Sequence, residues 1–206
     1  MTVAKDSKPV PLRERNRLRT RGDILDVAAE LLGAEGYAAT SLEVLAQKSG
    51  ISRGTIYAHF PGGRDEIIRE VYLRIADGVY VRGISLRDQL TDPAERITAL
   101  AQALVEATRE PGGRFYGVMG PDIVPVVSGI MGSTSRSFEH IIAQDLQDAM
   151  AAGHLSREAP AATLATTLTG AIRAAGVSAA LNPAQASQAV DAIRLLAQGL
   201  LVRATA

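Results

Sequence analysis

Two short helices separated by a single glycine constrain this sequence more than any other feature. Residues 40–49 and 53–60 each show the apolar spacing of a helix, and Gly50 lies between them. A residue that can cap a helix precedes each segment, and the Pro-Gly-Gly run at 61–63 stops the second. Helices of barely two turns cannot bury their apolar sides alone, so a neighbouring helix must brace them. The sequence therefore predicts a compact helical bundle around this pair.

Capping boxes indicate where the first helices begin. Thr20 with Asp23 three residues later predicts the start of a helix that ends at Gly36, a residue suited to a left-handed stop. Thr40 with Glu43 forms a second box at the start of the next helix. These signals predict three short helices, followed by a long one, in about the first 80 residues.

The rest of the chain also has the pattern of helices. Aromatic residues make up only 4% of the chain and Trp is absent, a balance that favours helices over sheets. Residues 114–132 are apolar but broken by Gly and Pro, and predict no definite element. The fold class is therefore all-α, with further helices expected from Pro93, which follows the capping Asp92, and over about 65–83, 133–152, 161–181 and 184–203.

Charge is distributed unevenly along the chain. The 22 basic and 22 acidic residues give a net charge of zero, which by itself argues against a nucleic-acid partner. Residues 1–21, however, hold seven basic and two acidic residues, a local charge of +5. We expect residues 1–19 to be a disordered basic arm, either a solvated tail or a contact for phosphate.

The start of the second short helix carries side chains suited to DNA. Arg53 can read guanine or pair with phosphate, and Gly54 removes a side chain that would hold the backbone away from a groove. Near them, Ser52 and Thr55 carry short hydroxyl groups, and Tyr57 and His59 can donate hydrogen bonds to phosphate oxygens. The alternative is an ordinary helical hairpin within a protein core.

Residues from about Thr20 to Arg74 resemble the N-terminal domain of the TetR (tetracycline repressor) family of regulators. The resemblance covers about a quarter of the chain, and its segments occur in the family's order and spacing. They are Ile24-Leu25-Asp26-Val27-Ala28, Glu35-Gly36-Tyr37, Thr40, Ala46, Gly50-Ile51-Ser52-Arg53-Gly54-Thr55-Ile56-Tyr57, His59-Phe60 and Arg64-Asp65-Glu66.

The resemblance implies a helix-turn-helix DNA-binding domain over 20–80, with the motif at about 41–60, and a helical ligand-binding and dimerisation domain over 81–206. It implies that Tyr57 and Arg64 clamp the phosphate backbone and that Thr40 touches phosphate. Many members have Lys at the position of Arg64, after a loop one residue shorter. The expected DNA contacts are Thr40, Ser41, Ser52, Arg53, Gly54, Thr55, Tyr57, His59 and Arg64, joined by the arm from Arg13 to Arg21.

The last two helices are expected to pair with those of a second copy. The resemblance implies a homodimer, which matches a palindromic operator in double-stranded DNA. Residues 161–181 contain a single charge, Arg173, and helices so poor in charge are buried, in a core or between subunits. The apolar face expected of the final helix comprises Val190, Ile193, Leu196, Ala197 and Leu200.

The resemblance also implies a small-molecule pocket between the DNA-binding head and the dimer helices. Large soft side chains gather at Phe115, Tyr116, Met119, Met131 and Phe138, although each could equally pack the core. Arg173, Arg114, Arg136 and His140 could anchor the polar end of a ligand, or form surface contacts. The expected function is a repressor that releases its operator on binding an effector; the alternatives are a ligand-independent regulator and an activator.

Enzymatic function is not expected. No phosphate loop, zinc-protease motif or nucleophile elbow is present, and the three histidines lack metal-ligand spacing, so neither cofactor nor metal is predicted. The chain has no Cys and no apolar signal at its N-terminus. The longest apolar stretch, residues 118–132, is too short to span a membrane. We therefore expect a cytoplasmic protein without a membrane partner.

Overall fold

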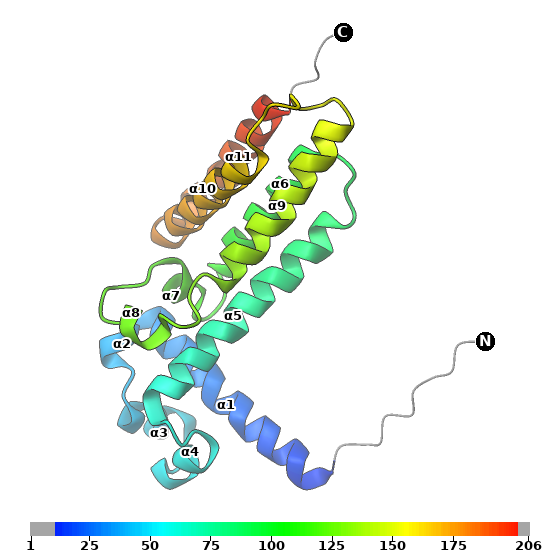
Figure 1. Cartoon of the computed structure of the whole chain (residues 1–206). Coiled ribbons are helices and arrows are strands. Elements are labelled where there is room, and N and C mark those ends of the chain that lie inside the picture. The colour runs from blue at the N-terminus through cyan, green and yellow to red at the C-terminus, as the bar shows by residue number, and fades with distance from the viewer. Residues whose placement is uncertain (1–10, 202–206) are drawn as a thin grey trace, which may run out of the picture.

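The computed structural model describes residues 11–201, where all helices and turns belong to an all-α fold, as predicted (Figure 1). The helices are α1 (Leu12–Ala34), α2 (Gly36–Ala39), α3 (Leu42–Ser49), α4 (Arg53–His59), α5 (Gly63–Arg87), α6 (Pro93–Ala107), α7 (Gly113–Gly117), α8 (Val124–Val127), α9 (Ser133–Ala151), α10 (Ala161–Leu181) and α11 (Ala186–Leu200), with a 3-10 turn, η1 (Pro183–Gln185), before α11.

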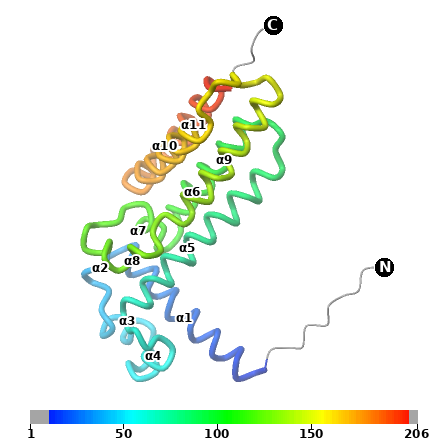
Figure 2. Tube along the Cα trace, viewed as in Figure 1, coloured from blue at the N-terminus to red at the C-terminus, as the bar shows by residue number. Residues whose placement is uncertain are grey.

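The N-terminal helices form a head at one end of the molecule. Helices α1, α3 and α4 pack around the first half of α5, at the lower end of the view in Figure 2. The short helices are anchored by single fully buried side chains, Leu45 from α3 and Ile56 from α4, and Phe60 closes the core after α4. Because α3 and α4 bury so little each, α1 and α5 must hold them in place.

The second core lies between α5, α6, α9, α10 and α11. Its largest buried side chains include Leu100, Ile142, Leu146 and Ile172. Helix α5 runs from the head along the whole bundle (Figure 1). At Gly83 a Cβ atom would lie 3.0 Å from the Phe138 ring, so glycine allows α5 and α9 to approach closely. The head and the bundle are thus joined through one continuous helix.

Helix α10 is long and apolar enough to cross a membrane by length and composition. In this structure it packs against α6, α9 and α11, and contributes Ala165, Leu168 and Ile172 to the bundle core. The inner side of α10 thus belongs to the bundle core, while Val177 and Leu181 on the same helix are exposed.

The predicted start of the first helix is wrong. Helix α1 begins at Leu12, after Pro11, and not at Thr20, so residues 12–19 of the predicted disordered arm are helical. Leu and Arg, which dominate this stretch, have high helix propensity and lose little side-chain freedom in a helix. Their side chains are exposed. Residues 1–10 of the predicted arm lie outside the described residues.

Of the four predicted N-caps, Ser52 and Asp92 are confirmed, while Thr20 and Thr40 are wrong. Ser52 accepts a hydrogen bond from the Thr55 N–H at 3.1 Å, and Asp92 caps α6, with Pro93 in its first turn. Gly50 ends α3, as predicted, and has a left-handed conformation with φ of 68°. The N-cap of α3, however, is Ser41, not Thr40, because its Oγ accepts from the Val44 N–H at 3.2 Å.

The residues predicted to share one apolar face of the final helix differ in their exposure. Ile193 and Ala197 are buried and contribute to the bundle core, as expected. Leu196 was predicted on the same face but is 55% exposed, and the adjacent Leu195 is 69% exposed. The apolar residues of α11 therefore divide between a core side and an outer side.

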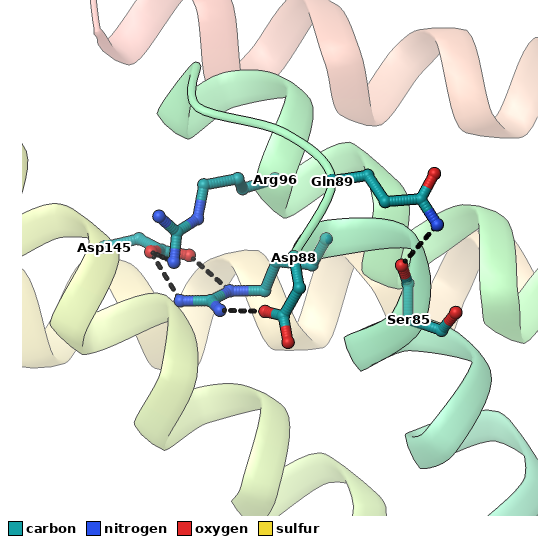
Figure 3. Close-up of polar contacts among 6 residues, drawn as sticks. Ser85, Asp88, Gln89, Arg96 and Asp145 are labelled. Carbon is teal, nitrogen blue, oxygen red and sulfur yellow. Dashed lines mark hydrogen bonds and ion pairs between the residues drawn. The ribbon is translucent and has the colours of Figure 1, made fainter.

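An ion-pair network fixes the far end of α5 (Figure 3). Asp145 on α9 is buried and accepts two hydrogen bonds from Arg87, at 2.8 and 3.1 Å. Arg96 on α6 contacts the same carboxylate at 2.9 Å. Two guanidinium groups facing one buried carboxylate compensate its charge, and removal of the carboxylate would leave Arg96 without its partner and Arg87 with only the exposed Asp88.

Asp145→Asn is expected to lower the free energy of unfolding by about 3 kcal/mol, since the arginine charges lose their counter-ion in a buried setting. Urea denaturation followed by circular dichroism measures this. Asp191→Asn is the matched control, because Asp191 pairs with Arg194 at an exposed position and its loss should cost less than about 1 kcal/mol. Equal losses of unfolding free energy in the two variants would show that the network does not hold the end of α5 in place.

Candidate nucleic-acid interface and cavity

The outer surface of α4 presents the residues predicted to contact DNA. Ser52, Arg53, Gly54, Thr55 and Tyr57 are all exposed, whereas Ile56 and Phe60 are buried. The Ser52 hydroxyl caps the helix and lies 2.8 Å from the Thr55 hydroxyl. The N-terminal turn of α4 thus has a polar, solvent-facing side, and its first amides lie beside two hydroxyl groups.

Gly54 has no structural reason to be glycine. It lies inside α4 with a negative φ, and an added Cβ would meet only the Ser52 Oγ, at 3.9 Å. Glycine within a helix costs roughly 1 kcal/mol relative to alanine. At the exposed first turn of α4, the absence of a side chain leaves room for another molecule to approach the helix closely.

Arg53 is held beside the helix axis by Glu43. Its guanidinium lies 2.9 Å from the Glu43 carboxylate on α3, and both side chains are more than half exposed. A hydrogen bond from its own backbone N–H, and next the Arg53 charge, hold the pKa of Glu43 below its ordinary value. Arg53 is therefore oriented at the outer surface by a partner from which it can be released.

Tyr57 and His59 differ in their freedom to reach phosphate. Tyr57 is 46% exposed and its ring borders Gly63 at the start of α5. His59 is half-buried, and its Nδ1 is buried without a hydrogen-bond partner among residues 11–201. The geometry leaves Tyr57 open to a phosphate, while the contact predicted for His59 stays a prediction.

Two expected phosphate contacts do not fit this structure. Thr40 is fully buried and its hydroxyl donates to the Gly36 carbonyl at 2.9 Å. Arg64 stacks on the Tyr37 ring at 3.8 Å and donates to the Tyr37 carbonyl. Both side chains fix the segment between α1 and α3, so neither is presented to a ligand. Ser41, beside Thr40, is half-buried and occupied as the α3 cap.

Arg21 was expected among the arm's phosphate contacts, and that prediction is also wrong. Its guanidinium pairs with Glu70, lies 4.0 Å over the Phe60 ring and donates to the His59 carbonyl. It therefore joins α1 to the end of α4 and to α5. The contacts predicted for the more N-terminal arginines remain possible, because those side chains are exposed along α1.

A cavity of about 520 Å³ lies between the head and the bundle. Five of the predicted ligand-binding residues line it: Tyr116, Met119, Met131, Phe138 and Arg173. Phe115 does not, because it is buried in the head core and borders a second cavity of about 440 Å³ together with Arg114. Arg136 donates to the Met131 carbonyl outside the cavity lining, and His140 is exposed on α9.

Hydrogen bonds connect the cavity wall to α5. The Tyr116 hydroxyl donates to Thr134 at 3.0 Å, and Thr134 donates to the Ala76 carbonyl at 3.1 Å. The Tyr72 hydroxyl accepts from the Gly132 N–H at 3.2 Å. Burial raises the pKa of the Tyr116 phenol to about 12, so it keeps its proton at neutral pH.

Sequence reasoning missed several residues of this wall. Tyr72 and Thr134 were expected only as parts of helices. Thr169 was expected only as part of the helix over 161–181, which contains a single charge. Thr169 is buried, yet its Oγ1 has no hydrogen-bond partner in the described part of the chain. A polar residue amid an apolar helical face was the one available signal.

Comparisons with known proteins agree with this geometry. Residues 24–71 match the model of the bacterial regulatory proteins of the tetR family. The chain superposes on a TetR-family transcriptional regulator from Pectobacterium atrosepticum with a TM-score of 0.70 and 25% identity, over 92% of this chain and 97% of that one. The chain thus carries a TetR-family DNA-binding region at residues 24–71 and shares its fold with a TetR-family regulator.

Two curated bacterial regulators are similar in sequence to part of the chain. The chain is 32% identical to the HTH-type transcriptional regulator LmrA of Bacillus subtilis over 41% of its length and 45% of that protein's. It is 31% identical to the transcriptional repressor KstR2 of Mycobacterium tuberculosis over 42% of its length and 43% of that protein's. These alignments thus span less than half of either relative. The KstR2 structure shares the fold over 97% of this chain and 100% of that one, with a TM-score of 0.65 and 19% identity.

Gly54→Ala is expected to stabilise this TetR-family head by up to about 1 kcal/mol, because alanine is the better helix former and meets no neighbour. It is expected to weaken DNA binding, since the new methyl group would hold α4 away from the groove. Thermal unfolding and a gel shift measure the two effects.

The matched control is Gly78→Ala on α5, where an added Cβ also meets nothing within 4 Å. It should stabilise the protein similarly and leave DNA affinity unchanged. Unaltered DNA affinity in Gly54→Ala would remove the argument that α4 approaches another molecule closely at this residue.

Proposed function

We propose that this protein binds a palindromic operator as a homodimer and releases it when a small molecule occupies the 520 Å³ cavity. The observation that carries the DNA-binding part is the outer surface of α4. It combines an unexplained glycine, a releasable arginine and an exposed tyrosine on a helix braced by three others. Such a surface suits the major groove.

Homodimerisation is supported by the outer sides of α10 and α11. Val177 and Leu181 on α10, and Leu195 and Leu196 on α11, are exposed large apolar side chains. Small residues lie beside them on α10, at Gly170 and Ala174, which together with Val177 also border the cavity. An apolar surface formed by two adjacent helices suits pairing with its own copy about a twofold axis. Two heads would then meet two half-sites of the operator.

Release by an effector is supported by the position of α5. Tyr72 lines the cavity, while Gly63, at the start of the same helix, borders Tyr57 of the DNA-binding surface. Nine residues of helix separate them, about 14 Å. A ligand that displaces Tyr72 therefore moves a rigid element that also bears on α4. The two heads of a dimer would change their separation, and simultaneous groove contact would be lost.

A regulator without an effector, or an activator, would use the same α4 surface. The sign of regulation depends on where the operator lies relative to the promoter. The presence of a lined cavity with hydrogen bonds to α5 favours the effector-dependent function.

The test is a gel shift on the DNA that flanks the protein's own gene, repeated with a panel of small molecules. The double variant Arg53→Ala, Tyr57→Ala is expected to lose at least about a hundredfold in affinity, because a base or phosphate contact and a second phosphate contact disappear. The matched control is Tyr80→Ala, Arg82→Ala, which removes an exposed tyrosine and an exposed arginine from α5. A folded, dimeric double variant that binds as tightly as the parent would disprove the assignment.

Leu195→Glu, Leu196→Glu is expected to convert the dimer to monomers, because four carboxylates would be placed in an apolar interface. Analytical ultracentrifugation measures the mass. Val81→Glu on α5 is the control, since Val81 is 57% exposed outside the proposed interface. A variant that remains dimeric while Val81→Glu dissociates would place the interface elsewhere.

A further inference from the structure

We infer that the 520 Å³ cavity takes an apolar molecule ending in a single carboxylate, which Arg173 and Thr169 hold. The inference rests on the proposed function, because it names the chemistry of the effector assigned to this cavity. It depends on the charge, the unpaired polar groups and the walls of the cavity.

Among residues 11–201, Arg173 is the only charged side chain that lines the cavity. It forms no ion pair with any residue in the range 11–201. The other residues that line the cavity include no Asp or Glu that could neutralise its charge. Its side chain is exposed at the cavity's edge, where it can turn inwards. A guanidinium offers paired donors that match a carboxylate.

Thr169 supplies a second donor on the same helix. It lies four residues before Arg173 on α10, so the two side chains are neighbours on one helical face. Thr169 is only 4% exposed, and its hydroxyl has no partner among the described residues, although it borders the cavity. A buried hydroxyl without a partner is unfavourable, and a ligand oxygen would satisfy it.

The remaining walls favour an apolar body. Leu104, Met119, Met131, Phe138 and Ile172 line the cavity. The Tyr116 proton is already donated to Thr134, so this residue presents mainly its ring. The volume lies within the roughly 300–1,000 Å³ typical of ligand pockets. One guanidinium cannot neutralise a buried dianion such as a phosphate monoester, and it would repel a cation.

The test measures binding to the purified full chain by calorimetry, without DNA. The probes are octanoate, dodecanoate, hexadecanoate and phenylpropanoate, each compared with its primary amide and methyl ester. At least one carboxylate is expected to bind about tenfold more tightly than its own amide, as a charge-assisted hydrogen bond exceeds a neutral one.

Variants separate the two donors. Arg173→Met is expected to abolish the preference for the carboxylate, and Thr169→Val, which keeps the side-chain shape, to weaken carboxylate binding about three- to tenfold. Arg136→Met is the matched control, because this nearby exposed arginine does not line the cavity. It should bind as the parent does. Thermal unfolding checks that each variant is folded.

Three results would overturn the inference: no carboxylate binds, the amides bind equally well, or Arg173→Met retains the preference. These outcomes are independent of the proposed function. Carboxylate binding that leaves the DNA complex intact would refute effector-dependent release and keep the ligand assignment. Release of DNA by uncharged molecules alone would refute the ligand assignment and keep effector-dependent release.

Discussion

Helix α5 is the element on which the rest of the structure depends, because it belongs to both hydrophobic cores. Ile67 and Val71 are buried in the head, and Val79 is buried in the bundle. Its end is held at Arg87 by the buried Asp145 of α9. An α-helix stretches little, so its two halves cannot move independently. The orientation of the head relative to the bundle is therefore set by how a single helix sits in two packed environments.

The segment around α7 and α8 links the same two regions a second time. Phe115 and Ile123 are buried in the head core, while Tyr116 and Met119 line the cavity. The head core thus does not end near residue 80, the predicted domain boundary. Adjacent residues facing opposite ways also explain why sequence reasoning assigned Phe115 to the cavity. An occupant of the cavity would contact a segment packed directly on α1 and α5.

Local signals predicted much of the fold, and long-range contacts account for the errors. Gly50 and Ser52 act through their own backbone or the next turn, so sequence alone identifies their roles. Arg21 and Arg64, in contrast, have partners 27 to 49 residues away. A phosphate contact was suggested for Arg21 by its place in the basic arm and for Arg64 by the family resemblance. Helical spacing placed Leu196 on the same apolar face as Ile193 and Ala197, although Leu196 is exposed in the single chain. Spacing cannot distinguish a core side from an outer apolar side, because both carry leucine.

The ion pair between Arg53 and Glu43 gives the α4 surface an internal competitor. A nonspecific phosphate offers Arg53 little more than the carboxylate it already has, since both are anions at an exposed site. A guanine edge at the correct position offers two acceptors in a desolvated groove. Exchange of the Glu43 carboxylate for a guanine edge by Arg53 is then favourable mainly on the matching sequence. Glu43 would thus reduce retention on unrelated DNA and leave more of the protein free to search for its target.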